Sequence, residues 1–182
     1  WTNNTYVGGA LYKHRGDHIH YGIDGNVCLL GYKLGEFQIN GHIDAGFKLG
    51  KDSLTIAAKV FFRNETPDYF LQHYRSNHYR WDNQFNKLYR LQVSGELAYP
   101  TKWVKPKLKV SFENITQHIY FDTDGTPKQA DKDIQVLAAD LQLNITTPWV
   151  NLDNGIVYQM SSSDKIPLPT LTMYNNLYYH GT

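Results

Sequence analysis

Charged side chains recur at alternate positions of three stretches whose pattern is that of β-strands. The basic ones are Lys59, Arg63, Arg90, Lys105, Lys107 and Lys109. Because side chains two residues apart share one face of a strand, adjacent strands would gather these cations on one wall. If the wall lined a water-filled pore, it would favour anions slightly. Glu96 and Glu113 fall on the same face, with Asp140 on a later strand, so a charge-balanced solvated face is an equally good interpretation.

A second group of candidate residues is aromatic. The polar segment 64–84 contains Tyr69, Tyr74, Tyr79 and Trp81. Aromatic side chains with a polar tip favour interfaces and binding surfaces. We therefore expect an external loop that could stack on sugars, pack inward as a plug, or fold over the mouth of the domain.

Other chemistry finds little support. His18 and His20 share a strand face, but no carboxylate or cysteine completes a metal-binding spacing. Cys28 is the single cysteine, so we expect no internal disulfide and a small apolar filler. The sequence shows no Ser–His–Asp set, phosphate loop or plausible carboxylate pair. We accordingly predict that the protein is not an enzyme and has no cofactor or metal ion.

The composition narrows the class of protein. The 182 residues fit one domain, or part of a larger one. The 18 Lys and Arg residues nearly balance 17 Asp and Glu residues, which argues against a nucleic-acid partner. A hydrophobic fraction of 41% is too high for a disordered chain. The mean hydropathy of −0.51 and the lack of a run of about 20 apolar residues argue against a membrane-spanning helix.

Apolar and polar residues alternate along most of the chain. From Phe37 to Leu49 the alternation has no slip, which is the pattern of a half-buried strand. Similar stretches follow at 53–63, 85–99, 104–113, 137–146, 150–160 and 171–179, and weaker ones precede them near 4–13 and 18–32. About nine strands in this order predict an all-β fold, an antiparallel up-and-down meander.

Alternation gives one dry face and one wet face, which a soluble sandwich or a membrane barrel would both use. Strands of about 10–13 residues suit the roughly 9–11 that cross a bilayer at a tilt, whereas the usual strand has about 5–6. Tight turns at 50–51, 100–102 and 147–148 alternate with long loops at 64–84, 122–132 and 161–169, as in outer-membrane barrels. We therefore predict part of a transmembrane β-barrel.

Two further features of the expected dry face support a barrel. Small residues there would leave voids in a soluble core, whereas lipid chains can fill such gaps; they are Gly41, Ala45, Ala58, Gly95 and Ala139. Aromatic residues gather near the predicted strand ends, as in the interfacial girdles of membrane proteins. They are Tyr12, Phe62, Tyr99, Trp103, Tyr120, Phe121, Trp149, Tyr158 and Tyr179.

Three short stretches carry a resemblance to known sequences: Trp81–Phe85, Ser111–Ile115, and Ile166–Pro169 continuing through Leu177–Tyr179. Through them, roughly the C-terminal 100 residues resemble the outer-membrane porin family of the Bacteroidota. The resemblance implies a protein several times longer, with a signal peptide and more strands. It implies no catalytic residues.

We therefore expect residues 1–182 to be a single-domain fragment, a partial β-barrel of about nine strands and half a barrel or less. A start at Trp1 without an initiator Met also suggests an internal piece. The expected role is passive diffusion of small hydrophilic solutes through the outer membrane of a Gram-negative cell, with a slight preference for anionic solutes and with outer-membrane lipid as the surrounding partner. The alternative is a soluble or surface-attached β-sandwich that binds carbohydrate through the aromatic loop.

Overall fold

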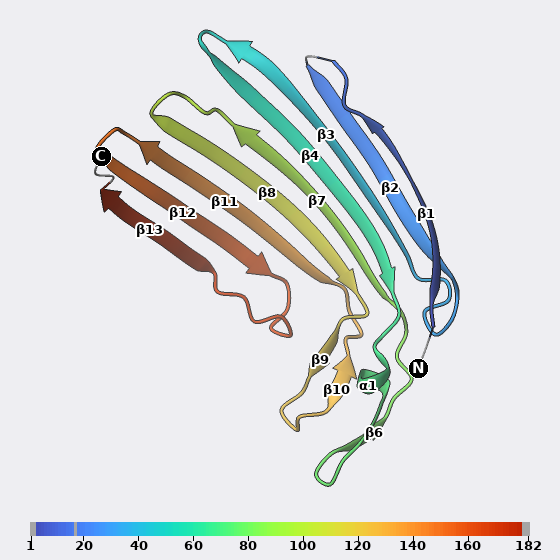
Figure 1. Cartoon of the computed structure of the whole chain (residues 1–182). Helices are drawn as coiled ribbons and strands as arrows, with labels where there is room; N and C mark the ends of the chain where they lie inside the picture. The colour runs from blue at the N-terminus through green and yellow to red at the C-terminus, as the bar shows by residue number, and fades with distance from the viewer. Residues whose placement is uncertain (1–2, 17, 180–182) are drawn as a thin grey trace.

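The computed structural model describes residues 3–16 and 18–179, and its main body is one nine-stranded antiparallel sheet. Figure 1 shows the strands side by side in chain order, with the turns at one end and the long loops at the other. The wall strands are β1 (Thr5–Lys13), β2 (Ile19–Leu30), β3 (Phe37–Leu49), β4 (Asp52–Glu65), β7 (Leu88–Ala98), β8 (Val104–Thr116), β11 (Ile134–Thr146), β12 (Val150–Ser161) and β13 (Leu171–Tyr179). The predicted all-β meander is confirmed.

The register of the sheet is regular. In the β3–β4 hairpin, pairing runs from Phe37 opposite Asn64 to Leu49 opposite Asp52, and Gly50 turns the chain with a φ of 69°. Such a positive φ suits glycine, which has no Cβ to clash. Among the described strand pairs, the one register shift lies between Thr5 and Tyr6, at the start of β1. Beyond this point the register is uninterrupted, which keeps each side chain on the face that the alternation predicts.

The long loops contain small elements of their own. Between β4 and β7 lie the one-turn helix α1 (Tyr69–Gln72) and a hairpin of β5 (His73–Arg75) and β6 (Arg80–Asp82). Between β8 and β11, β9 (Ile119–Phe121) pairs with β10 (Pro127–Gln129). In the described ranges, no helix combines the length and the apolar character needed to cross a membrane.

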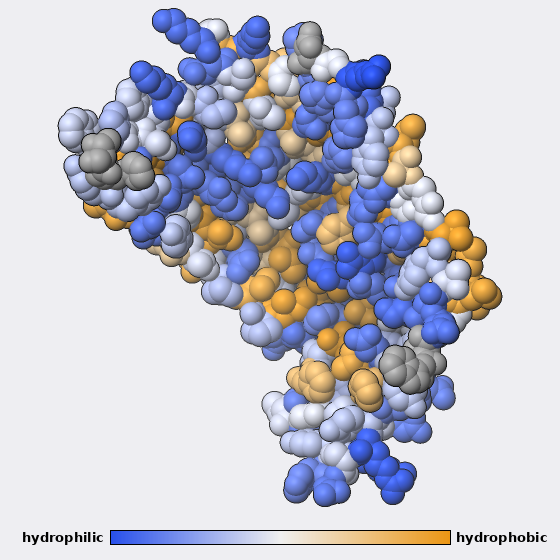
Figure 2. Space-filling model, in the orientation of Figure 1, coloured by the Kyte–Doolittle hydropathy of each residue, from blue (hydrophilic) through white to orange (hydrophobic). Residues whose placement is uncertain are grey.

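The two faces of the sheet differ sharply in polarity. The outward side chains are mainly aliphatic and well exposed, as at Ile43, Val93 and Leu141. The other face is polar, and it is hollowed along β3, β4, β7 and β8, where His42, Lys59 and Ser94 line a pocket. Figure 2 views this face, which is mainly hydrophilic over the middle of the sheet, with hydrophobic residues chiefly along its margins and near the loops.

In the described ranges, many apolar side chains of the sheet stay exposed. The chain exposes 12776 Å², although about 9000 Å² is expected for a compact protein of its mass, 21.0 kDa. Of the described residues, the apolar ones with buried side chains are Cys28, Ile115, Ala130 and Ile134. The alternative of a β-sandwich is therefore wrong, because the described strands form one continuous sheet instead of two sheets with facing apolar sides.

The aromatic girdles are confirmed only in part. Near the loop end, Phe37, Phe62 and Tyr89 form a row of contacting rings on the outward face, with ring centroids 5.4 and 6.5 Å apart. The prediction for Tyr12 is wrong, because this residue lies on the polar face, where its hydroxyl donates to Asp24. The prediction that Tyr120 and Phe121 belong to a girdle is also wrong, because both lie in the small strand β9 and not in the wall.

Candidate functional site

The predicted charged residues all lie on the polar face of three adjacent wall strands. Lys59 and Arg63 come from β4, Arg90 and Glu96 from β7, and the remaining four from β8; these are Lys105, Lys107, Lys109 and Glu113. The register brings them together, since Arg63 lies opposite Arg90 and Glu96 opposite Lys109. Asp140 of β11 lies on the other side of Lys109. The charges therefore form one continuous patch, the central charged patch.

Half of the basic residues in the central charged patch form ion pairs. Arg90 binds Glu113 through two nitrogens, with Nε 2.7 Å and the Nη2 atom 2.5 Å from Oε1. Arg63 lies 2.9 Å from Glu65, and Lys107 lies 3.1 Å from Glu96. Such partly exposed pairs contribute little to stability, because water screens them. Their main effect here is to fix the positions of the arginines.

The other three basic residues of the central charged patch are lysines without an ion pair among the described residues. Within the described residues, Lys59, Lys105 and Lys109 have no carboxylate oxygen within 4.0 Å, although Lys109 lies between Glu96 and Asp140 in the register. The patch therefore carries an excess of positive charge. Acidic residues flank it on both sides, with Asp24 and Asp44 on β2 and β3 and Asp153 on β12.

A hollow of about 760 Å³ opens at the loop end of the central charged patch. Arg90, Glu113 and Glu65 line it from the strands, while His118, Ile166 and Leu168 reach it from the loops. Burial lowers the pKa of His118, and the positive charges of Arg90 and Lys165 lower it further. The imidazole is therefore held in its neutral form more strongly than that of a free histidine.

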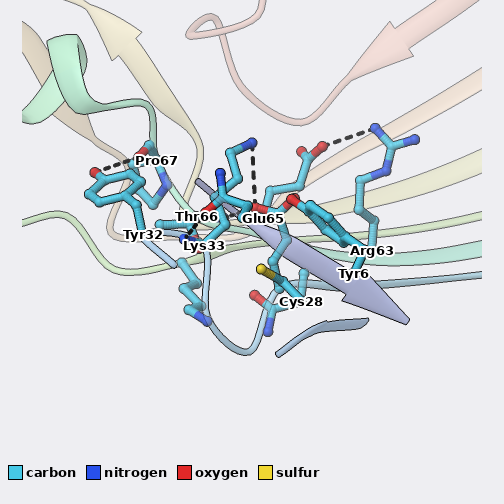
Figure 3. A network of polar contacts seen from close by, with 12 residues as sticks. Tyr6, Cys28, Tyr32, Lys33, Arg63, Glu65, Thr66 and Pro67 are labelled. Atoms are coloured by element: carbon cyan, nitrogen blue, oxygen red, sulfur yellow. Dashed lines mark hydrogen bonds and ion pairs between the residues drawn. The ribbon is translucent and has the colours of Figure 1, made fainter. Parts of the chain in front are cut away.

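Polar contacts tie the long loops to the adjoining end of the sheet (Figure 3). The hydroxyl of Tyr32 donates to the carbonyl of Pro67 over 2.9 Å, and the amide N–H of Thr66 donates to Glu36 over 3.1 Å. Gln72 donates to the hydroxyl of Tyr32 and accepts from the amide N–H of Phe85. Because segments far apart in the sequence share these hydrogen bonds, the loop after β4 is fixed over the long-loop end of the sheet.

The aromatic loop residues are brought together, but largely with one another. Trp81 stacks on Tyr74 with ring centroids 4.6 Å apart, and Tyr79 and Phe121 contact the same indole at 6.4 Å. The indole N–H donates to the carbonyl of Phe70. Tyr69 lies apart from this group, beside Tyr32 and His73. Trp81 thus acts as the centre of a small loop core that joins β5–β6 to β9–β10.

Sequence reasoning missed the polar cluster on strands β1 to β3. The ring of Tyr12 lies across β2 toward His42, with ring centroids 5.9 Å apart, and its hydroxyl lies 3.0 Å from Asp24. Gly22 makes this crossing possible, because a Cβ there would lie 2.2 Å from the Tyr12 ring. Asn40 also donates to Asp24, over 2.7 Å. The sequence does contain a signal for this cluster. Side chains an even number of residues apart share one face of a strand, so Tyr12 lies on the same face as Tyr6.

The chemistry available to this face is electrostatic. In the part of the chain that the structure describes, no three His, Cys, Asp or Glu residues gather as metal ligands would. His20 lies 2.9 Å from Asp44 and 3.0 Å from the carbonyl of Gly16, which leaves neither ring nitrogen free. The arrangement can attract, repel and hydrogen-bond solutes.

Comparison with known proteins agrees with this geometry. A family model described as "Putative porin" matches residues 1–182, which is the whole chain. No curated protein matches it. The match covers the N-terminal strands as well as the C-terminal stretches that carry the resemblance. Porins are β-barrel channel proteins, and the strand lengths, the alternating turns and loops and the exposed apolar face all fit that architecture. The chain therefore belongs to this porin family.

Proposed function

We propose that the chain forms part of the wall of a water-filled channel in the outer membrane of a Gram-negative cell, through which small hydrophilic solutes diffuse passively. One observation carries the proposal: a single curved sheet has an exposed aliphatic face and a hollowed polar face. In lipid, a backbone polar group without a partner is costly, and strand pairing satisfies these groups. The polar face then borders water.

A closed wall needs more strands than these nine. Among the described residues, β1 pairs only with β2 and β13 only with β12, so each leaves one edge without a partner strand. Such edges are not tolerated within the hydrocarbon region. We infer that further strands complete the barrel and that residues 1–182 are a single-domain fragment, half of it or less.

The central charged patch supports a weak preference for anions. Among the described residues, Lys59, Lys105 and Lys109 have no ion pair, whereas Glu96 and Glu113, the two glutamates of the patch, are each bound to a basic residue. Asp140 is the one acidic residue of the patch that has no ion pair within the described ranges, so three unpaired lysines face one unpaired carboxylate. An anion passing this wall would meet lysines that are free to contact it. The acidic flanks on β2, β3 and β12 oppose this effect and keep the expected selectivity small.

The test uses the full-length gene product in a planar bilayer with a salt gradient. We expect stepwise conductance and a reversal potential on the anion-selective side. Replacing Lys105, Lys107 and Lys109 together by Glu should move the reversal potential toward that of a cation-selective pore. Substituting Glu for Lys128, Lys132 and Lys165 in the long loops provides a control with the same change in charge.

Each outcome bears on a different part of the proposal. If the protein inserts but conducts no ions, the channel function is wrong. If it conducts and the Lys105/Lys107/Lys109 variant keeps the wild-type reversal potential, the channel stands and the anion preference is wrong. If the loop control shifts the potential as much as that variant, the central charged patch does not set the selectivity.

A further inference from the structure

The two ends of the sheet carry opposite charge balances. The short-turn end, at residues 13–18, 48–53, 99–105 and 147–150, has six basic residues and two aspartates in the sequence. The basic ones are Lys13, Arg15, Lys48, Lys51, Lys102 and Lys105. The four connections at the long-loop end, 31–36, 66–87, 117–133 and 162–170, contain seven basic and eight acidic residues. A positive rim is therefore confined to one end.

Three lysines of this rim lie where the apolar face ends. Lys51 is in the β3–β4 turn beside Leu49, and Lys102 is in the β7–β8 turn beside Trp103. The Nζ atom of Lys102 lies 4.7 Å from the centre of the Trp103 ring. The Nζ atom of Lys13 lies 5.8 Å from the centre of the Tyr21 ring. We refer to Lys13, Lys51 and Lys102 as the rim lysines.

The aromatic residues mark the height of the rim in a bilayer. Trp103 is 42% exposed and Trp149 is 68% exposed, and both lie in the turns at this end. Tryptophan and tyrosine concentrate at the level of lipid headgroups. A lysine stacked on such a ring therefore has its ammonium group at the level of the phosphates, with its aliphatic stem along the apolar surface.

The spacing of the turns also suits a row of headgroups. Neighbouring strands lie about 4.8 Å apart, so successive hairpin turns are separated by about 10 Å. In the described part of the chain, Lys51 and Lys102 have no carboxylate oxygen within 4.0 Å, so nearby acidic residues do not neutralise them. Each ammonium group can bind a separate phosphate.

We propose that the rim lysines bind the phosphate groups of anionic phospholipids in the leaflet that faces the short turns. This inference rests on the proposed function, because it requires the apolar face to lie in a membrane. A lysine near an anionic membrane surface contributes a factor of about five to association. The three rim lysines together should therefore give an easily measured preference for charged lipid.

The experiment places the full-length protein in phosphatidylcholine vesicles that contain a trace of spin-labelled lipid. Electron paramagnetic resonance then gives the fraction of labelled lipid that is immobilised at the protein surface. We expect labelled phosphatidylglycerol to be immobilised several-fold more than labelled phosphatidylcholine, and the difference to shrink in high salt. Replacing the three rim lysines together by Gln should remove most of it.

The matched control replaces Lys128, Lys132 and Lys165 of the long loops by Gln and should keep the preference. Equal immobilisation of the two lipids by the wild-type protein would overturn the proposal. So would a rim variant that keeps the wild-type ratio, or a control that loses it. If neither lipid is immobilised, the apolar face does not lie in the membrane, and the proposed function fails together with this inference.

Discussion

A charged substitution on the apolar face gives the sharpest test of the membrane orientation. Leu141 and Gln142 are neighbours near the middle of β11, so they lie at nearly the same depth but on opposite faces. Leu141 is 47% exposed among Leu108 and Ile156 of the adjacent strands. Gln142 lies on the polar face, where its amide donates to Asp140 over 3.1 Å. An arginine at each position samples lipid in one case and water in the other.

The size of the effect follows from depth. An arginine facing lipid at the bilayer midplane costs about 2–4 kcal/mol, which corresponds to roughly 30- to 900-fold in the folding equilibrium. Ile145 lies four residues nearer the turns, about 14 Å along the strand and about 10 Å along the bilayer normal at a tilt of about 40°. That position is near the edge of an apolar band about 25 Å high, so I145R should cost only about 0–1 kcal/mol.

The assay is reversible urea unfolding of the full-length protein in lipid vesicles, followed by intrinsic fluorescence and by heat-dependent gel mobility. We expect L141R to lose the most stability, I145R less, and Q142R to remain close to wild type because its guanidinium can contact Asp140. Surface substitutions in water usually stay within about 0.5 kcal/mol. Equal, small losses for L141R and Q142R would refute a lipid-facing surface on this side of the sheet.

Three further predictions concern the loops and the N-terminal wall. W81A should make the segment 73–82 much more sensitive to protease and leave unfolding of the barrel unchanged, because the indole lies at the centre of the loop core. Cleavage of W81A and wild type at the same rate would contradict this. Because the pKa of His118 is lowered in the folded loop, protonation of this imidazole favours the unfolded loop. The resistance of the loop to protease should therefore be full above about pH 6.5 and fall below it. H118N should flatten that profile, whereas H78N, at an exposed position, should leave it unchanged. G22A should displace the ring of Tyr12 and raise the mobility of β1 in hydrogen exchange; unchanged exchange rates would show that the crossing is not needed.

Much of the wall could be predicted from the sequence because its signals are local. Alternation fixes which face each residue occupies, and tight turns such as Gly50–Lys51 fix the register of the adjoining strands. The position of Lys59, Lys105 and Lys109 on one face follows from parity alone. The prediction for Tyr12 is wrong because its position near a strand end is typical of a girdle residue, whereas its even number places it on the polar face of β1.

The loops and the detailed ion pairing could not be predicted in this way. Strand β9 pairs with β10 through three residue pairs, too few to show as a periodic pattern. Lys107 contacts Glu96 although Lys109 lies directly opposite that glutamate, because long side chains reach diagonal neighbours. Such choices depend on rotamers and on contacts between distant segments, which alternation does not encode.

The regular hairpin order of the wall has a consequence for how such a protein can change size. Each wall strand pairs only with its neighbours in the chain, so the sheet is close to a one-dimensional array of hairpins. Its short sequence separations favour rapid, stepwise pairing during assembly. Duplication or loss of one whole hairpin would leave the polarity of both faces and the side of every loop unchanged. Evolution could therefore widen or narrow the barrel two strands at a time, whereas a change of one strand would move all later loops to the opposite end.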